Sequence, residues 1–130
     1  MTTPVDPYPR SLSAREADTL RFLLSLDDDR LEALRAQAAT AYVTGRCGCG
    51  CATIHLAVDR ERTPAAVDLC GMVASADARP VEGDLGSGLL LFLDDGWLSL
   101  LEIWWIDVPP PEFPPVPAFE PPRFACDDQR

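Results

Sequence analysis

Apolar residues in the first part of the chain recur at helical spacing. Leu20, Leu23 and Leu24 follow Ser13-Ala14-Arg15-Glu16. Those four residues fit a capping box, in which the serine hydroxyl and the glutamate carboxylate satisfy free backbone N–H groups at a helix start. The pattern therefore predicts a first helix over residues 14–25.

A second apolar stripe follows the acidic run Asp27-Asp28-Asp29, which is typical of a turn and a helix N-cap. The stripe consists of Leu31, Leu34, Ala38, Ala41 and Tyr42. It predicts a second helix over residues 29–43, with Gly45 as its C-cap.

From residue 52 onward the apolar period changes from helical spacing to alternation. Four segments fit strands: residues 54–58, 67–76, 88–93 and 97–106. Asp94-Asp95-Gly96 predicts a tight turn that joins the last two as a hairpin. We expect the first two strands to be antiparallel neighbours.

These elements predict an α+β domain over residues 1–107, in which two N-terminal helices pack on one face of an antiparallel sheet of about four strands. Residues 1–10 are expected to be a loose arm. Residues 108–130 form a proline-rich C-terminal arm, since residues 108–123 hold eight of the 13 prolines. Proline cannot donate to a sheet ladder, so this arm is expected to be extended or disordered.

Composition excludes several functions. The chain has 11 basic and 21 acidic residues, a net charge of −10. An acidic surface repels phosphate backbones, so we expect no nucleic-acid binding. No lysine is present, which excludes Schiff-base chemistry and the lysine-containing phosphate loop. No apolar run is long enough for a membrane span, and Met1–Asp6 does not resemble a signal peptide, so a cytoplasmic location is predicted.

Cysteine is concentrated in Cys47-Gly48-Cys49-Gly50-Cys51, and the other two cysteines are Cys70 and Cys126. An odd number in a chain predicted to be cytoplasmic favours free thiols or metal ligation over a disulfide framework. If the glycines let the backbone curl, the three clustered thiols and His55 could supply a Cys₃His set for zinc. Two alternatives remain: the cysteines fill a tight loop as small apolar residues, or one is a reactive thiol.

The last predicted strand carries apolar residues on both faces, including Trp104 and Trp105. One face should pack on the helices, and the proline-rich arm is expected to fold over the other through its phenylalanines. The alternatives are a partner-binding patch formed by Glu102, Trp104 and Trp105, or a polyproline ligand at residues 113–117.

The stretch Ala41-Tyr42-Val43-Thr44-Gly45-Arg46-Cys47-Gly48-Cys49-Gly50-Cys51 and the later Asp95-Gly96-Trp97-Leu98-Ser99-Leu100-Leu101-Glu102-Ile103 resemble small uncharacterised proteins of high-G+C actinobacteria. Those proteins have no assigned activity, so the resemblance implies no functional residue.

Two functional hypotheses follow from the residues. The first is a non-enzymatic interaction module that binds a protein partner, a second copy of the chain among the candidates, through the outer sheet face. The second is a zinc-binding or thiol-reactive protein centred on the cysteine cluster. With a single histidine and no nucleophile motif, the chain offers no catalytic residue set.

Overall fold

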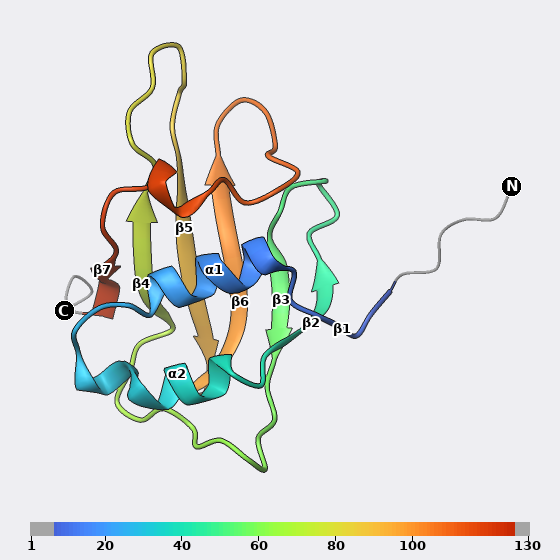
Figure 1. Ribbon diagram of the computed structural model, residues 1–130, viewed down its shortest axis with the longest axis vertical. Coiled ribbons are helices and arrows are strands. Elements are labelled where there is room, and N and C mark those ends of the chain that lie inside the picture. The colour runs from blue at the N-terminus through green and yellow to red at the C-terminus, as the bar shows by residue number, and fades with distance from the viewer. Residues whose placement is uncertain (1–6, 127–130) are drawn as a thin grey trace, which may run out of the picture.

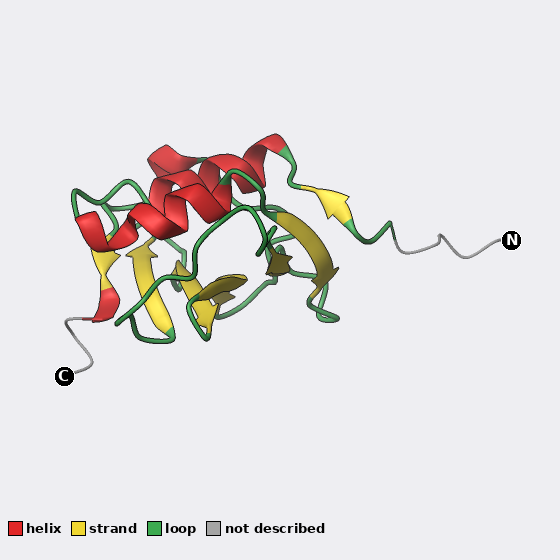
Figure 2. Cartoon of the chain, turned by 90° about the horizontal axis from the view of Figure 1, so that it is seen from below, coloured by secondary structure: helices red, strands yellow, loops and turns green. Residues whose placement is uncertain are grey.

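The computed structural model describes residues 7–126, which form one antiparallel sheet with helices on one of its faces. The sheet has seven strands in the order β1-β2-β3-β6-β5-β4-β7. Both α-helices cross the same face, as the edge-on view in Figure 2 shows. The predicted α+β class is confirmed, but the expectation of about four strands was too low.

The helices are α1 (Ala14–Leu23) and α2 (Glu32–Ala38), with 3₁₀ turns η1 (Asp29–Leu31) and η2 (Val116–Ala118). The strands are β1 (Arg10–Ser11), β2 (Tyr42–Arg46), β3 (Ile54–Ala57), β4 (Met72–Asp77), β5 (Ser87–Asp94), β6 (Trp97–Trp105) and β7 (Arg123–Phe124). Within residues 7–126, no helix has the length and apolarity needed to cross a membrane. Residues 1–6 of the expected N-terminal arm lie outside the described part, whereas Arg10 belongs to β1.

Helix α1 begins with the predicted capping box. The Ser13 hydroxyl accepts from the Glu16 N–H, and the Glu16 carboxylate accepts from the Ser13 N–H at 2.8 Å. The same carboxylate takes two hydrogen bonds from the Arg10 guanidinium, at 2.7 and 2.9 Å. One buried acid therefore caps the helix and ties it to strand β1.

The second predicted helix is too long at its C-terminal end. Helix α2 stops at Ala38, and the chain continues as β2, in which Gly45 lies opposite His55 rather than capping a helix. Tyr42, Val43 and Thr44 are aromatic or β-branched residues, which favour strands. Val43 is fully buried, so pairing with β3 both satisfies the backbone and places this side chain in the core.

The two strands expected to be neighbours are separated in the sheet. Strand β3 pairs with β2 and β6, whereas β4 pairs with β5 and β7. The β5–β6 hairpin therefore lies between them, at the centre of the sheet (Figure 1). The strand order follows from long-range pairing, which alternation within each strand does not reveal.

The turn of this hairpin follows the prediction. Asp95 and Gly96 both have positive φ, 51° and 85°, as a two-residue type I′ turn requires. Gly96 is further constrained because a Cβ there would lie 2.2 Å from the Ala66 carbonyl oxygen. The glycine thus serves both the turn and the close approach of residues 64–66.

A buried amide joins α2 to this turn. The Gln37 Nε2 donates to the carbonyls of Pro64 and Gly96, each at 2.9 Å, and its Oε1 accepts from the Leu98 N–H at 2.9 Å. Gln37 has no exposed surface. All three contacts are long-range, so this side chain fixes the position of α2 over the hairpin.

The proline-rich segment lies on the helix side of the sheet, not over the outer face as expected. Phe113 and Phe119 are buried in the core, and the Phe119 ring lies 6.4 Å from the ring of Phe22 on α1. The Arg15 guanidinium donates to the Phe113 carbonyl at 2.8 Å. Figure 1 shows the segment passing on the side of the sheet that carries the helices. Residues between the prolines make its backbone hydrogen bonds: the Ala118 carbonyl accepts from the Arg79 N–H, and the Glu120 N–H donates to the Asp77 carbonyl, each at 2.8 Å.

Two cysteines form a disulfide that the sequence interpretation did not favour. Cys70 and Cys126 are bonded, with their Cα atoms 5.4 Å apart. The pair links the segment before β4 to the one after β7, and those two strands are neighbours in the sheet. The expectation of free thiols was wrong for these two residues, because sheet pairing brings together positions 56 residues apart.

Candidate functional site: the cysteine loop

The clustered cysteines lie in the loop that joins β2 to β3. The Cys47 N–H donates to the Thr53 carbonyl at 3.0 Å, which closes the loop directly beyond the last strand pair. Residues 48 and 49 form a turn. An extended chain would separate residues two apart by about 6.6 Å, so this turn is what allows the thiols to meet.

The three thiols converge. The sulfurs of Cys47, Cys49 and Cys51 all lie within 4.8 Å of one another. The Cys47 thiol contacts the Cys49 sulfur at 2.9 Å, and the Cys51 N–H donates to the same sulfur at 3.4 Å. Three soft donor atoms at this spacing could hold a metal ion.

The three clustered cysteines differ in their exposure to solvent. Cys49 is exposed, Cys47 is half-buried, and Cys51 is only 2% exposed and belongs to the hydrophobic core. An ion held by these sulfurs would be anchored by the core through Cys51 and open to solvent beside Cys49. The packing interpretation accounts for Cys51 but not for an exposed Cys49.

Hydrogen bonds among the thiols spread their pKa values apart. The contact with Cys47, followed by that with Cys51, raises the pKa of Cys49 to about 11. Burial raises the pKa of Cys51, but hydrogen bonds from Cys49, Thr53 and Cys47 outweigh it and lower that pKa to about 7. The first proton therefore leaves this cluster far more readily than the second. Binding of a cation would favour loss of the remaining protons.

His55 is not brought to the sulfurs. It lies exposed on β3, opposite Gly45 and Leu100. Within residues 7–126, the set of converging ligand atoms contains the three cysteines and excludes His55. The sheet explains this, because His55 is paired on both sides and its side chain follows the strand rather than the loop.

Sequence reasoning missed Arg46, which holds the loop in place. Its guanidinium donates to the Cys51 carbonyl at 3.1 Å and to the Pro111 carbonyl at 3.3 Å. Arg46 thus connects the cysteine loop to the proline-rich segment. The only sequence signal is an arginine directly before the first cysteine.

The residues predicted to form a partner-binding patch are divided between the two faces of the sheet. Glu102 pairs with Leu90, and Trp104 pairs with Gly88. Neither belongs to the core that packs under the helices. Trp105 packs against that core instead, and it lines a cavity with Pro110 and Pro114. Glu102 and Trp104 therefore share the outer face, and Trp105 does not.

The outer face near Trp104 carries Glu102 and several apolar side chains. Phe92 pairs with Leu100 there, next to the Leu90–Glu102 pair. These side chains are half-buried by one another, and both helices lie on the opposite side (Figure 2). No described helix covers this surface.

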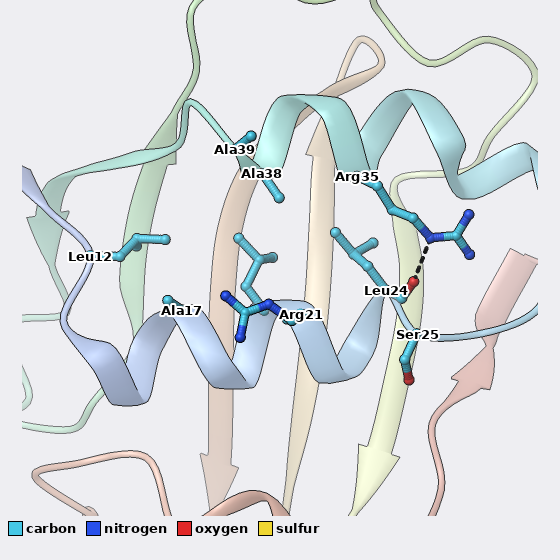
Figure 3. Close-up of a pocket in the computed structure, with 9 residues that line it drawn as sticks. Leu12, Ala17, Arg21, Leu24, Ser25, Arg35, Ala38 and Ala39 are labelled. Atoms are coloured by element: carbon cyan, nitrogen blue, oxygen red, sulfur yellow. Dashed lines mark hydrogen bonds between the residues drawn. The ribbon is translucent and has the colours of Figure 1, made fainter.

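A cavity of about 390 Å³ lies between α1 and α2 (Figure 3). Its wall is mainly apolar, with Leu20 from α1, Leu24 directly after that helix, and Ala38 from α2. The Arg35 guanidinium at its edge donates to the carbonyls of Leu24 and Leu26. Arg35 is thereby engaged in closing the end of α1, so it holds the two helices together instead of facing a ligand.

Comparison of the chain with protein-family models, with curated proteins and with solved structures finds no match. The functional argument therefore rests on the residues of the site.

Proposed function

We propose that this protein binds a thiophilic metal ion, zinc in the first place, through Cys47, Cys49 and Cys51. The observation that carries the proposal is the convergence of the three sulfurs within 4.8 Å. Thiolates are preferred ligands for zinc, with Zn–S distances of about 2.3 Å. At that distance, two sulfurs on a tetrahedral zinc lie about 3.8 Å apart, so binding requires the Cys47 and Cys49 sulfurs to separate from their present 2.9 Å.

Three protein ligands leave the fourth position of a tetrahedral zinc open. The exposed side of the cluster at Cys49 gives a water molecule or an external ligand access to that position. A fourth ligand from His55 requires the β2–β3 loop to move toward the strand. The site with an external fourth ligand and the site completed by His55 differ in whether His55 contributes to zinc affinity.

The test is elemental analysis of the untagged protein with a parallel thiol count. We expect about one zinc per chain and three free thiols that react only after chelation. Cys49→Ser should lose the metal. His55→Ala should retain it if an external ligand fills the fourth position. A metal-free protein in which the exposed Cys49 thiol reacts at once without a chelator would contradict the proposal.

A second candidate is a protein partner bound at the outer sheet face. It is supported by the position of the proline-rich segment, which lies on the helix side and leaves Glu102 and Trp104 uncovered. The expected first partner is a second copy, because two such apolar faces are self-complementary.

Sedimentation over a range of concentrations tests this candidate. Leu90→Arg, on the outer face, should weaken self-association. Val67→Arg is the matched control, because Val67 is apolar and 75% exposed but lies outside the sheet. If both variants behave like the parent, self-association does not use this face.

A further inference from the structure

Two of the three sulfurs are already close to bonding distance. The Cys47 and Cys49 sulfurs are 2.9 Å apart, whereas a disulfide bond is about 2.05 Å long. Closing it requires a movement of under about 1 Å between the two sulfurs. The turn at residues 48 and 49 supplies the chain reversal that such a short ring needs.

Solvent access differs among the three thiols in a way that selects this pair. Cys49 is exposed, and Cys47 is half-buried beside it. Cys51 is 2% exposed, so a small disulfide from solvent cannot reach it easily. Cys49 is therefore the point of entry for an oxidant, and Cys47 is the thiol placed to follow.

We propose that Cys47 and Cys49 form a reversible dithiol–disulfide switch that controls whether the cysteine loop holds its metal ion. The metal-release part rests on the proposed function, whereas formation of the disulfide does not. The oxidant is a small-molecule disulfide of the glutathione class.

The reaction is a pair of thiol–disulfide exchanges. Cys49 loses its proton to solvent, and its sulfur attacks one sulfur of the small disulfide, forms a mixed disulfide and displaces one small thiolate. Because the pKa of Cys49 is raised to about 11, this first exchange is expected to be slow near neutral pH and faster as the pH rises. The Cys47 thiolate then attacks the Cys49 sulfur and displaces the second. The protein pair loses two electrons and two protons in total, and the small disulfide gains them as two thiols.

Oxidation removes two of the three ligands of the ion. Cys51 alone would then remain, and one thiolate is too few for a stable zinc site, which needs three or four protein ligands. Reduction by a small thiol restores the set. The Cys70–Cys126 disulfide lies beside β4 and β7, at the opposite end of the strand order from β2 and β3, so it is separate from the pair proposed to change redox state.

Proteolytic digestion separates the three clustered cysteines from the other two, so the redox state of the cysteine loop can be measured on one peptide. Cleavage after Arg46 and Arg60 yields a peptide of residues 47–60 that contains these three cysteines and neither Cys70 nor Cys126. The protein is incubated with graded ratios of oxidised to reduced glutathione, alkylated and digested. We expect this peptide to change from three alkylated cysteines to one, with fragmentation placing the remaining label on Cys51.

Two variants serve as controls. Cys51→Ser keeps the pair and should still form the disulfide at a similar glutathione ratio. Cys47→Ser should stop at the mixed disulfide on Cys49, visible as a glutathione adduct. A peptide that keeps three alkylated cysteines throughout, or a disulfide that includes Cys51 in the parent protein, would overturn the proposal.

The zinc-loaded protein tests the release step. We expect one equivalent of zinc to appear in solution per disulfide formed, followed with a chromophoric chelator, and to be taken up again on reduction. Disulfide formation without zinc release would overturn the proposal that the Cys47–Cys49 disulfide controls metal binding. A reduced protein that binds no zinc would overturn both the proposed function and the release step. In that case, alkylation and digestion of the metal-free protein would still show whether Cys47 and Cys49 form a disulfide.

Discussion

The indole of Trp104 lies directly over Gly88 on the neighbouring strand. The two residues are paired in the β5–β6 register, and a Cβ added to Gly88 would come within 2.2 Å of the Trp104 Nε1. Because Gly88 has no side chain, the indole ring can pack directly on its backbone on the outer sheet face. This contact explains why Trp104 is only half-exposed although no helix covers it.

Gly88→Ala should displace the Trp104 ring and destabilise the protein by about 1–3 kcal/mol, the usual cost of overpacking. Chemical denaturation gives the stability, and tryptophan emission reports the move of the ring into water. Gly71→Ala is the control, because a Cβ there meets nothing within 4 Å. If Gly88→Ala has the same stability and tryptophan emission as Gly71→Ala, the Trp104 ring does not pack on Gly88 in solution.

Gln37→Leu should cost about 2–4 kcal/mol. The change leaves the Leu98 N–H and the Pro64 carbonyl without their partner in a buried site, whereas the Gly96 carbonyl keeps its bond from the Ala66 N–H. Unsatisfied buried groups are expensive. The measurement is urea denaturation. Glu32→Leu, at an exposed position of the same helix, should change stability far less, and equal losses in the two variants would exclude a special role for the amide.

Glu16→Gln should have a pH-dependent effect. Burial raises the pKa of Glu16, but hydrogen bonds from Arg10 and Ser13 outweigh it and hold that pKa below its usual 4.5. A lowered folded-state pKa stabilises the protein above the unfolded value, and the stabilisation is lost as the pH falls through the folded-state pKa.

We therefore expect Glu16→Gln to cost about 1 kcal/mol at pH 7 and progressively less as the pH falls below 4.5. Stability curves at both ends of this range provide the comparison. A cost that is the same at pH 7 and pH 3 would mean that the charge of Glu16 does not contribute.

Phe113→Ala should destabilise the whole protein by about 3–5 kcal/mol, since its ring is 1% exposed and large core truncations have that cost. Val108→Ala, in the same proline-rich segment but 72% exposed, should be nearly neutral. Differential scanning calorimetry distinguishes the two. A small effect at Phe113 would mean that the segment is not part of the folded core.

The local features were predictable from the sequence. Ser13 and Glu16 cap α1, and Asp95-Gly96 makes the hairpin turn, because neighbouring residues alone determine such motifs. The C-terminal half of the second predicted helix was not predictable in the same way. Ala41 and Tyr42 continue the helical stripe in the sequence. The strand is favoured because Val43 becomes buried when β2 pairs with β3.

The site was predictable in part. Three cysteines alternating with glycine allowed convergence as one of three interpretations, and the structure brings their sulfurs together. Three other features depend on residues far apart in the sequence: the position of His55 along β3, the bond from Arg46 to Pro111, and the disulfide between Cys70 and Cys126. Sequence spacing carries no information about such contacts before the sheet order is known.

The disulfide also turns part of the polypeptide into a closed covalent ring. Residues 70–126 form this ring, which contains β4, the β5–β6 hairpin and β7. A single protease cut in the exposed segment 81–85 would open the ring without releasing a fragment. The nicked chain would migrate as one species until a reductant separated it, whereas a cut at residues 60–62 would yield two pieces at once under denaturing conditions.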